Sequence, residues 1–143
     1  MIARVWTEAD IPKIVEIEKV CFSDPWTVEA FESGMSNPFF HSVLLEDGGQ
    51  VCGYACQFVI FEDAEILNLA VSPAYRRKGL GRELLKELES YAKEKQAERT
   101  LLEVREGNLP ARSLYEAWGF KAFGVRKNYY EDGENAVLME KVF

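Results

Sequence analysis

The sequence contains few of the residues that bind metal ions or build disulfide frameworks. Its 143 residues include one histidine, His41, and three cysteines. Three cysteines cannot all pair within one chain, and Cys21, Cys52 and Cys56 lack the spacing of zinc ligands. We therefore expect reduced, structural thiols and no bound metal.

Long apolar segments are also absent. No stretch approaches the roughly 18 apolar residues that a membrane-spanning helix needs. The first residues, MIARVWTEADIPKI, carry acids where a signal peptide requires an unbroken apolar run. No segment is rich enough in proline, glycine and serine to act as a linker. These absences predict one domain over residues 1–143, a cytoplasmic location and no membrane partner.

Positive charge is in short supply, since 17 lysines and arginines stand against 24 acids. A general nucleic-acid binder must neutralise phosphates, so the net charge of −7 argues against nucleic acid as a partner. The acidic surplus is compatible with a basic partner.

Hydrophobic periodicity predicts an α/β chain that begins with a short strand at 2–6 and a helix within 7–22. Thr7 or Asp10 could cap this helix, whose apolar face would comprise Ile11, Ile14, Val15 and Ile17. Next come a helix within 24–35 entered through Thr27, strands at 42–46 and 51–60 around a turn at 47–50, and a strand at 65–71. The remaining expected elements are a helix at 79–95, a strand at 100–104, a helix from Asn108 to Gly119, and a closing hairpin with its tip at 131–133.

This pattern has the order βααβββαβαββ. It predicts a mixed, mostly antiparallel central sheet with flanking helices. The strands on either side of the 79–95 helix should be parallel, because a helical crossover of this kind joins parallel neighbours.

The turn YRRKGLGR, at 75–82, places basic side chains and two glycines where a strand gives way to a helix. A helix N-terminus carries unpaired N–H groups and a partial positive charge, and glycine lets a phosphate approach the backbone closely. A plain helix start with solvated cations is the alternative. A dinucleotide-binding turn fits poorly, since Leu84 stands in place of its third glycine, and the Gly-Lys-Ser/Thr of a nucleotide P-loop is absent.

The residues RRKGLG at 76–81 resemble the Arg/Gln-x-x-Gly-x-Gly/Ala signature of the GNAT family of N-acetyltransferases. The segments LEVREGNLPARSLYEAWGF and RKNYY are similar to the following strand and helix and to a late strand of that family. The resemblance runs from residue 2 to about residue 140. It implies the GNAT fold and acetyl-CoA as cosubstrate.

For the donor, the resemblance implies that backbone groups of Leu69, Ala70 and Val71 pair with the pantetheine arm, with the Val71 N–H polarising the thioester carbonyl. The resemblance also implies that the basic turn cradles the pyrophosphate, through Arg76, Arg77, Lys78, Gly79, Leu80, Gly81 and Arg82. Asn108 would contact coenzyme A, cap its own helix, or do both. A plain buried strand is the alternative for LNLAV.

Acetyl transfer to an amine needs a base for the amine proton and an acid for the departing thiolate. Glu103 interrupts the apolar strand TLLEV, and Tyr115 lies two helical turns beyond Asn108. A solvent-facing acid and a core tyrosine are the structural alternatives for the two residues. The resemblance assigns Glu103 as the general base and Tyr115 as the general acid.

Acceptor choice should reside in CFSDPWTVEAF, at 21–31, and in the closing hairpin, which border the acceptor side in the family's fold. The candidate contacts are Phe22, Trp26, Tyr129 and Tyr130, and the acids that could receive a basic peptide are Asp24, Glu131, Asp132 and Glu134. Core packing and solvated turns are the alternatives for these two sets.

The motifs are closest to family members that acetylate the N-terminal alanine of a small-subunit ribosomal protein. A protein N-terminus, on a basic ribosomal protein, is therefore the expected acceptor. A family member acting on other N-termini, a lysine or a small amine would retain the same cofactor residues. A non-catalytic acyl-CoA-binding module is the hypothesis from another class, and the presence of both Glu103 and Tyr115 argues against it.

Overall fold

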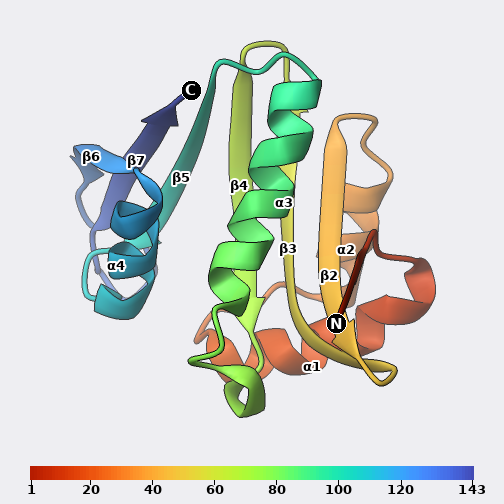
Figure 1. The fold of residues 1–143 in the computed structure, drawn as a ribbon. Helices are drawn as coiled ribbons and strands as arrows, with labels where there is room; N and C mark the ends of the chain where they lie inside the picture. The colour runs from red at the N-terminus through yellow and green to blue at the C-terminus, as the bar shows by residue number, and fades with distance from the viewer.

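A computed structural model describes all residues, 1–143, as one seven-stranded sheet flanked by helices (Figure 1). The strands lie in the order β1-β2-β3-β4-β5-β7-β6. They are β1 (Ile2–Arg4), β2 (Phe40–Asp47), β3 (Gln50–Ile60), β4 (Asp63–Val71), β5 (Arg99–Arg105), β6 (Lys121–Arg126) and β7 (Ala136–Val142). The helices are α1 (Ile11–Cys21), α2 (Val28–Met35), α3 (Leu80–Glu94) and α4 (Leu109–Trp118), with 3-10 turns at Glu8–Asp10 and Pro73–Tyr75.

The order of strands and α-helices is the one that hydrophobic periodicity predicts. The turn between β2 and β3 is formed by Gly48 and Gly49, both with positive φ, as the tight turn of a hairpin requires. The β4 and β5 strands, which flank α3, are parallel, and every other pair is antiparallel.

Two apolar clusters fill the two faces of the sheet. On one face, Leu80, Leu84, Leu85 and Leu88 of α3 pack with Tyr115 of α4. On the other face, Ile14 and Phe31 bring α1 and α2 against Leu44 and Tyr54 of the sheet. No helix of the structure is both long and apolar enough to cross a membrane.

Helix ends follow the expected capping chemistry with one exception. Thr27 Oγ1 accepts a hydrogen bond from Ala30 N at 3.1 Å and so caps α2. Asp10 occupies the N-cap position of α1, but its carboxylate does not cap that helix. It instead accepts from Thr7 N at 2.7 Å and pairs with Arg4 at 2.8 Å, which ties the 3-10 turn to β1.

The two parallel strands separate along their length, which Figure 1 shows as β4 and β5 close at one end and apart at the other. Their pairing is confined to residues 63–65 of β4 and 99–101 of β5. Beyond these residues, β4 and β5 no longer pair with each other. The sheet is therefore open at its centre, between α1 on one face and α4 on the other.

Candidate functional site

A cleft of about 180 Å³ lies where β4 and β5 separate. Residues 66–69 of β4 and 102–105 of β5 form its two sides. Its remaining lining comes from the end of α1 and the α1–α2 loop, from α4, and from the β6–β7 turn: Glu18, Phe22, Asp24, Trp26, Asn108, Ala111, Tyr115 and Tyr130. The cleft thus brings together residues from both faces of the sheet.

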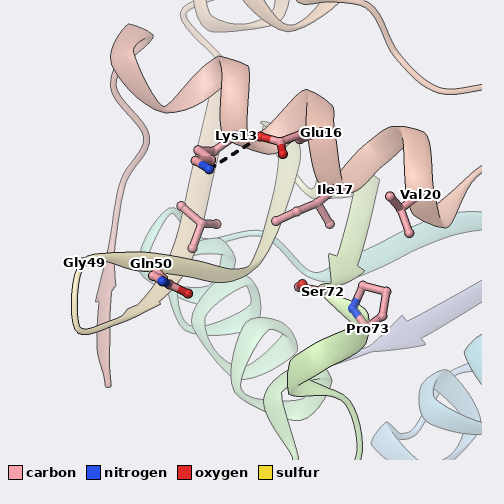
Figure 2. A pocket seen from close by; sticks show the side chains of 9 residues that line it. Lys13, Glu16, Ile17, Val20, Gly49, Gln50, Ser72 and Pro73 are labelled. Carbon is pink, nitrogen blue, oxygen red and sulfur yellow. Dashed lines mark ion pairs between the residues drawn. The ribbon is translucent and has the colours of Figure 1, made fainter.

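A larger hollow, of about 350 Å³, lies along α1 beside the β2–β3 turn and the end of β4 (Figure 2). Its ionisable side chains are Lys13 and Glu16, which pair with each other at 3.6 Å and are each 71% exposed. None of the expected site residues lines it. Size alone would favour this hollow, but the chemistry favours the smaller cleft.

The β4 edge presents free backbone groups to the cleft. Ser72 N donates to Cys52 O at 2.8 Å, and the register pairs Val71 with Gly53, Ala70 with Tyr54 and Leu69 with Ala55. In an antiparallel ladder, bonded and non-bonded pairs alternate, so Ala70 bonds to β3 while Leu69 and Val71 direct their N–H and C=O groups away from it. The backbone groups of Leu69 and the N–H of Val71 are therefore open to a ligand. Ala70 is already paired, and Val71 O already accepts from Arg76 and Cys21.

The basic turn after β4 exposes a run of backbone donors. No protein acceptor bonds the N–H groups of residues 77–82, which include the first turn of α3. Arg77 and Gly79 have positive φ values of 65° and 77°, so the chain turns sharply at both residues. Unpaired N–H groups at a helix start, surrounded by cationic side chains, are suited to phosphate oxygens.

The two glycines of this turn serve different purposes. At Gly79, the left-handed backbone conformation itself favours glycine, and an added Cβ would meet no other atom within 4 Å. At Gly81, a Cβ would lie 2.8 Å from Cδ2 of Leu114. Gly81 therefore permits the close approach of α3 to α4, the helix that carries Tyr115.

Three of the basic side chains already have partners within the protein. Arg76 folds back so that its Nε donates to Val71 O at 3.3 Å. Lys78 lies over the ring of Tyr75, and Arg82 lies over that of Trp118, at 5.4 and 5.5 Å from the ring centroids. The backbone of the turn thus offers anion-binding groups directly, while these side chains contribute mainly their charge.

Asn108 and Tyr115 lie on the face of α4 that borders the cleft. The side-chain oxygen of Asn108 accepts from Ala111 N at 3.3 Å, which confirms the predicted cap and leaves its amide nitrogen without a protein acceptor. Tyr115 packs edge-on against Phe120 in the core. Burial raises the pKa of Tyr115 to about 12, so its hydroxyl keeps its proton at neutral pH.

Glu103 lies on the opposite face of the sheet from Tyr115, on the side of the α1–α2 loop. Leu102 and Val104 point into the α3–α4 core, so alternation along β5 turns Glu103 to the other face. Arg126 Nε lies 3.3 Å from its carboxylate, which is 27% exposed. Burial, and then the charge of Glu103, raise the pKa of nearby Glu65. Glu103 is thus an accessible carboxylate with a cation beside it.

The aromatic residues expected on the acceptor side divide into two groups. Phe22, Trp26 and Tyr130 line the cleft, and Trp26 also packs on Phe31 with ring centroids 5.2 Å apart. Tyr129 lies outside the cleft lining and is 50% exposed. Interaction with the Glu103 carboxylate raises the pKa of Tyr129.

Three polar residues of the cleft were not predicted from the sequence as site residues: Glu18, Asn68 and Arg105. Glu18 occurs three residues after Val15 and four after Ile14, so its spacing on α1 was a usable signal. It is the fourth buried residue of that helix, whereas Ile17, expected on that face, is only partly buried. Asn68 and Arg105 gave no signal beyond a polar residue within or at the end of an apolar strand.

The chain is similar to known acetyltransferases in sequence and in structure. The model of the acetyltransferase (GNAT) family matches residues 11–120. A protein of Bacillus subtilis strain 168, provisionally named ribosomal protein bS18-alanine N-acetyltransferase, is 41% identical over 132 residues, 91% of this chain and 87% of that protein. The N-alpha-acetyltransferase RimI of Mycobacterium tuberculosis is 34% identical over 142 residues, 94% of this chain and 88% of that protein.

The crystal structure of the ribosomal-protein-S18-alanine N-acetyltransferase from Escherichia coli superposes with a TM-score of 0.91. The two chains share 32% identity, and the match covers 99% of this chain and 92% of that one.

Proposed function

The chain belongs to the GNAT family of acetyltransferases and is an acetyl-CoA-dependent N-acetyltransferase, and from this premise we propose that its acceptor is the α-amino group of a protein N-terminus. The proposed substrate is the N-terminal alanine of the small-subunit ribosomal protein bS18, the substrate in the names of its relatives. One observation carries the mechanism: a cleft through the sheet, bordered by a carboxylate from one face and a tyrosine from the other.

Acetyl-CoA supplies the acetyl group as a reactive thioester. The chain would hold it through the outward backbone groups of Leu69, the N–H of Val71 and the free N–H groups of 77–82. Asn108 would contribute its amide nitrogen while it caps α4. The open β4 edge and the unpaired donors fit such a ligand, because an extended arm can bond to the edge as a strand does and a pyrophosphate can accept from the donors.

Glu103 would remove the proton from the acceptor amine. An α-amino group has a pKa of about 7.7 to 8.0, so roughly a tenth of it is already neutral at pH 7. A carboxylate is a sufficient base for the proton lost during attack, directly or through a water molecule. Glu103 lies on the sheet face that carries the α1–α2 loop, and the acceptor would enter the cleft from this face.

Tyr115 would supply the proton that the departing thiolate takes. Its hydroxyl is protonated at neutral pH, and it can donate that proton to the sulfur as the carbon–sulfur bond breaks. Since Glu103 and Tyr115 approach from opposite faces of the sheet, one can accept a proton while the other donates one. Neither role requires a metal ion.

The acceptor is tested with two short basic peptides of one sequence, each containing an internal lysine. One has a free N-terminal alanine and the other is N-blocked, and release of the coenzyme A thiol is followed. Turnover of the free peptide alone is the expected result. Equal turnover of both would assign lysine as the acceptor, and no turnover of either, despite acetyl-CoA binding, would exclude this substrate class.

The catalytic roles are tested with Glu103→Gln and Tyr115→Phe. Each should lower kcat by about 10²- to 10⁴-fold, the usual effect of losing a general acid or base. Acetyl-CoA affinity, measured by calorimetry, should remain within about threefold of the wild type because neither change removes a proposed binding group. Wild-type kcat in either variant would contradict its assigned role.

A further inference from the structure

Arg105 joins the two segments that border the acceptor end of the cleft. It ends β5, two residues beyond Glu103, and so points to the same face of the sheet. Its Nη1 lies 2.9 Å from both Asp132 and Glu134, in the turn between β6 and β7. Its Nη2 lies 3.4 Å from Asp24, in the loop between α1 and α2.

The same guanidinium also contacts the aromatic lining of the cleft. Its central carbon lies 4.0 Å from the centroid of the Tyr130 ring, and both residues line the cleft. Glu134, one of its partners, accepts a second hydrogen bond from Gly107 N at 2.9 Å. Three segments distant in sequence are therefore connected through one side chain.

Arg105 is the least exposed member of this group, with 21% of its side chain accessible against 55% for Asp24 and 60% for Asp132. An ion pair between mobile, exposed side chains contributes little, but an anchored guanidinium with several carboxylates forms a network. Its planar fork can reach partners in two directions at once, which a lysine ammonium does less well.

We propose that Arg105 is a positioning residue that fastens the α1–α2 loop and the β6–β7 turn together, and so fixes the cleft walls that hold the acceptor peptide. The inference deepens the proposed function and rests on it. Asp24, Asp132 and Glu134, expected from sequence to receive a basic peptide, have this internal cation as their partner instead.

The test compares Arg105→Gln with Arg99→Gln, a matched change at the other end of β5. Arg99 also binds two carboxylates, Asp63 at 2.7 Å and Glu140 at 3.2 Å, but does not line the cleft. For Arg105→Gln, KM for the peptide with a free N-terminal alanine should rise about tenfold or more, with kcat within about threefold of the wild type. Acetyl-CoA affinity should be unchanged. Arg99→Gln should leave KM, kcat and acetyl-CoA affinity at their wild-type values.

The outcomes separate this inference from the function on which it rests. If the wild type fails to acetylate the peptide, the proposed acceptor is wrong. If the wild type is active and Arg105→Gln has an unchanged KM, or loses kcat alone, the positioning role is wrong. Should Arg105→Gln not fold, Asp24→Asn and Glu134→Gln each release one wall of the cleft, and each should raise the peptide KM with kcat retained.

Discussion

At the scale of single residues, Glu18 is the most demanding side chain to accommodate. The residue is 1% exposed, and its carboxylate has no cation within salt-bridge distance. Three donors compensate it: the Tyr54 hydroxyl at 2.5 Å, Asn68 Nδ2 at 3.0 Å and Trp26 N at 2.9 Å. A buried charge is tolerated when hydrogen bonds satisfy it in this way. The network connects α1, two strands of the sheet and the α1–α2 loop.

Replacing Glu18 by glutamine should destabilise the protein strongly. The glutamine amide nitrogen cannot accept a hydrogen bond, so at least one of the three donors would lose its acceptor. A fully buried polar group left unpaired costs about 1 to 3 kcal/mol. We expect the free energy of unfolding, from urea denaturation, to fall by about 2 to 4 kcal/mol. Glu16→Gln, on the exposed face of the same helix, is the control and should change it little. Equal effects of the two changes would show that the network contributes nothing.

At the scale of elements, the start of α3 packs against α4 and is also the proposed anion-binding site. Gly81 meets the packing requirement, because any Cβ there would lie 2.8 Å from Leu114. Gly79 meets a requirement of the backbone alone, since its φ is 77°. The two glycines therefore look alike in the sequence and differ in the reason for their presence.

Gly81→Ala and Leu114→Ala should be coupled. Shortening Leu114 removes the atoms that an alanine at 81 would displace, so the double variant should be more stable than the sum of the single effects by about 0.5 kcal/mol or more. Gly79→Ala should be additive with Leu114→Ala, because its cost arises from a strained backbone. Additivity in both pairs, measured by denaturation, would contradict the packing role of Gly81.

At the scale of the whole molecule, His41 connects stability to pH. Its ring stacks on Tyr91 of α3, with centroids 3.6 Å apart, and Lys95 lies over that same tyrosine ring. Gln57 Nε2 lies 3.0 Å from His41 Nδ1 and donates to Leu88 O at 2.9 Å. Since the amide nitrogen is only a donor, Nδ1 is the acceptor of the pair, as in a neutral imidazole. Burial lowers the pKa of His41 to about 4.

The native state should lose stability as the pH falls from about 6.5, the pKa of an unfolded histidine, to about 4. Across this window the unfolded chain binds a proton at His41 that the folded chain does not, so acid favours unfolding. We expect a loss of about 1 to 2 kcal/mol relative to His41→Gln, which cannot titrate. The free energy of unfolding, measured by denaturation at a series of pH values, should fall more steeply for the wild type within this window. Plotted against pH, it should run parallel for the two proteins above pH 7. Parallel curves throughout would show that His41 is not buried as a neutral ring.

Local sequence patterns were sufficient to predict the element order, the Gly48-Gly49 hairpin turn, the Asn108 and Thr27 caps and the parallel pair around α3, because each depends on spacing or on the conformational preference of a few neighbouring residues. The GNAT family followed from motifs that require no knowledge of packing. The roles of Glu103 and Tyr115 came with that resemblance and remain predictions.

Tertiary structure alone decided which residues share the cleft. Glu18, Asn68 and Arg105 are far apart in the sequence, and only the separation of β4 from β5 brings them together. It also decided that Asp24, Asp132 and Glu134 pair with Arg105, and that Ala70 bonds to β3 while Leu69 and Val71 face outward. The physical reason is that spacing determines which face a side chain occupies within its own element, whereas its partner depends on the register and separation of elements that only the folded chain brings together.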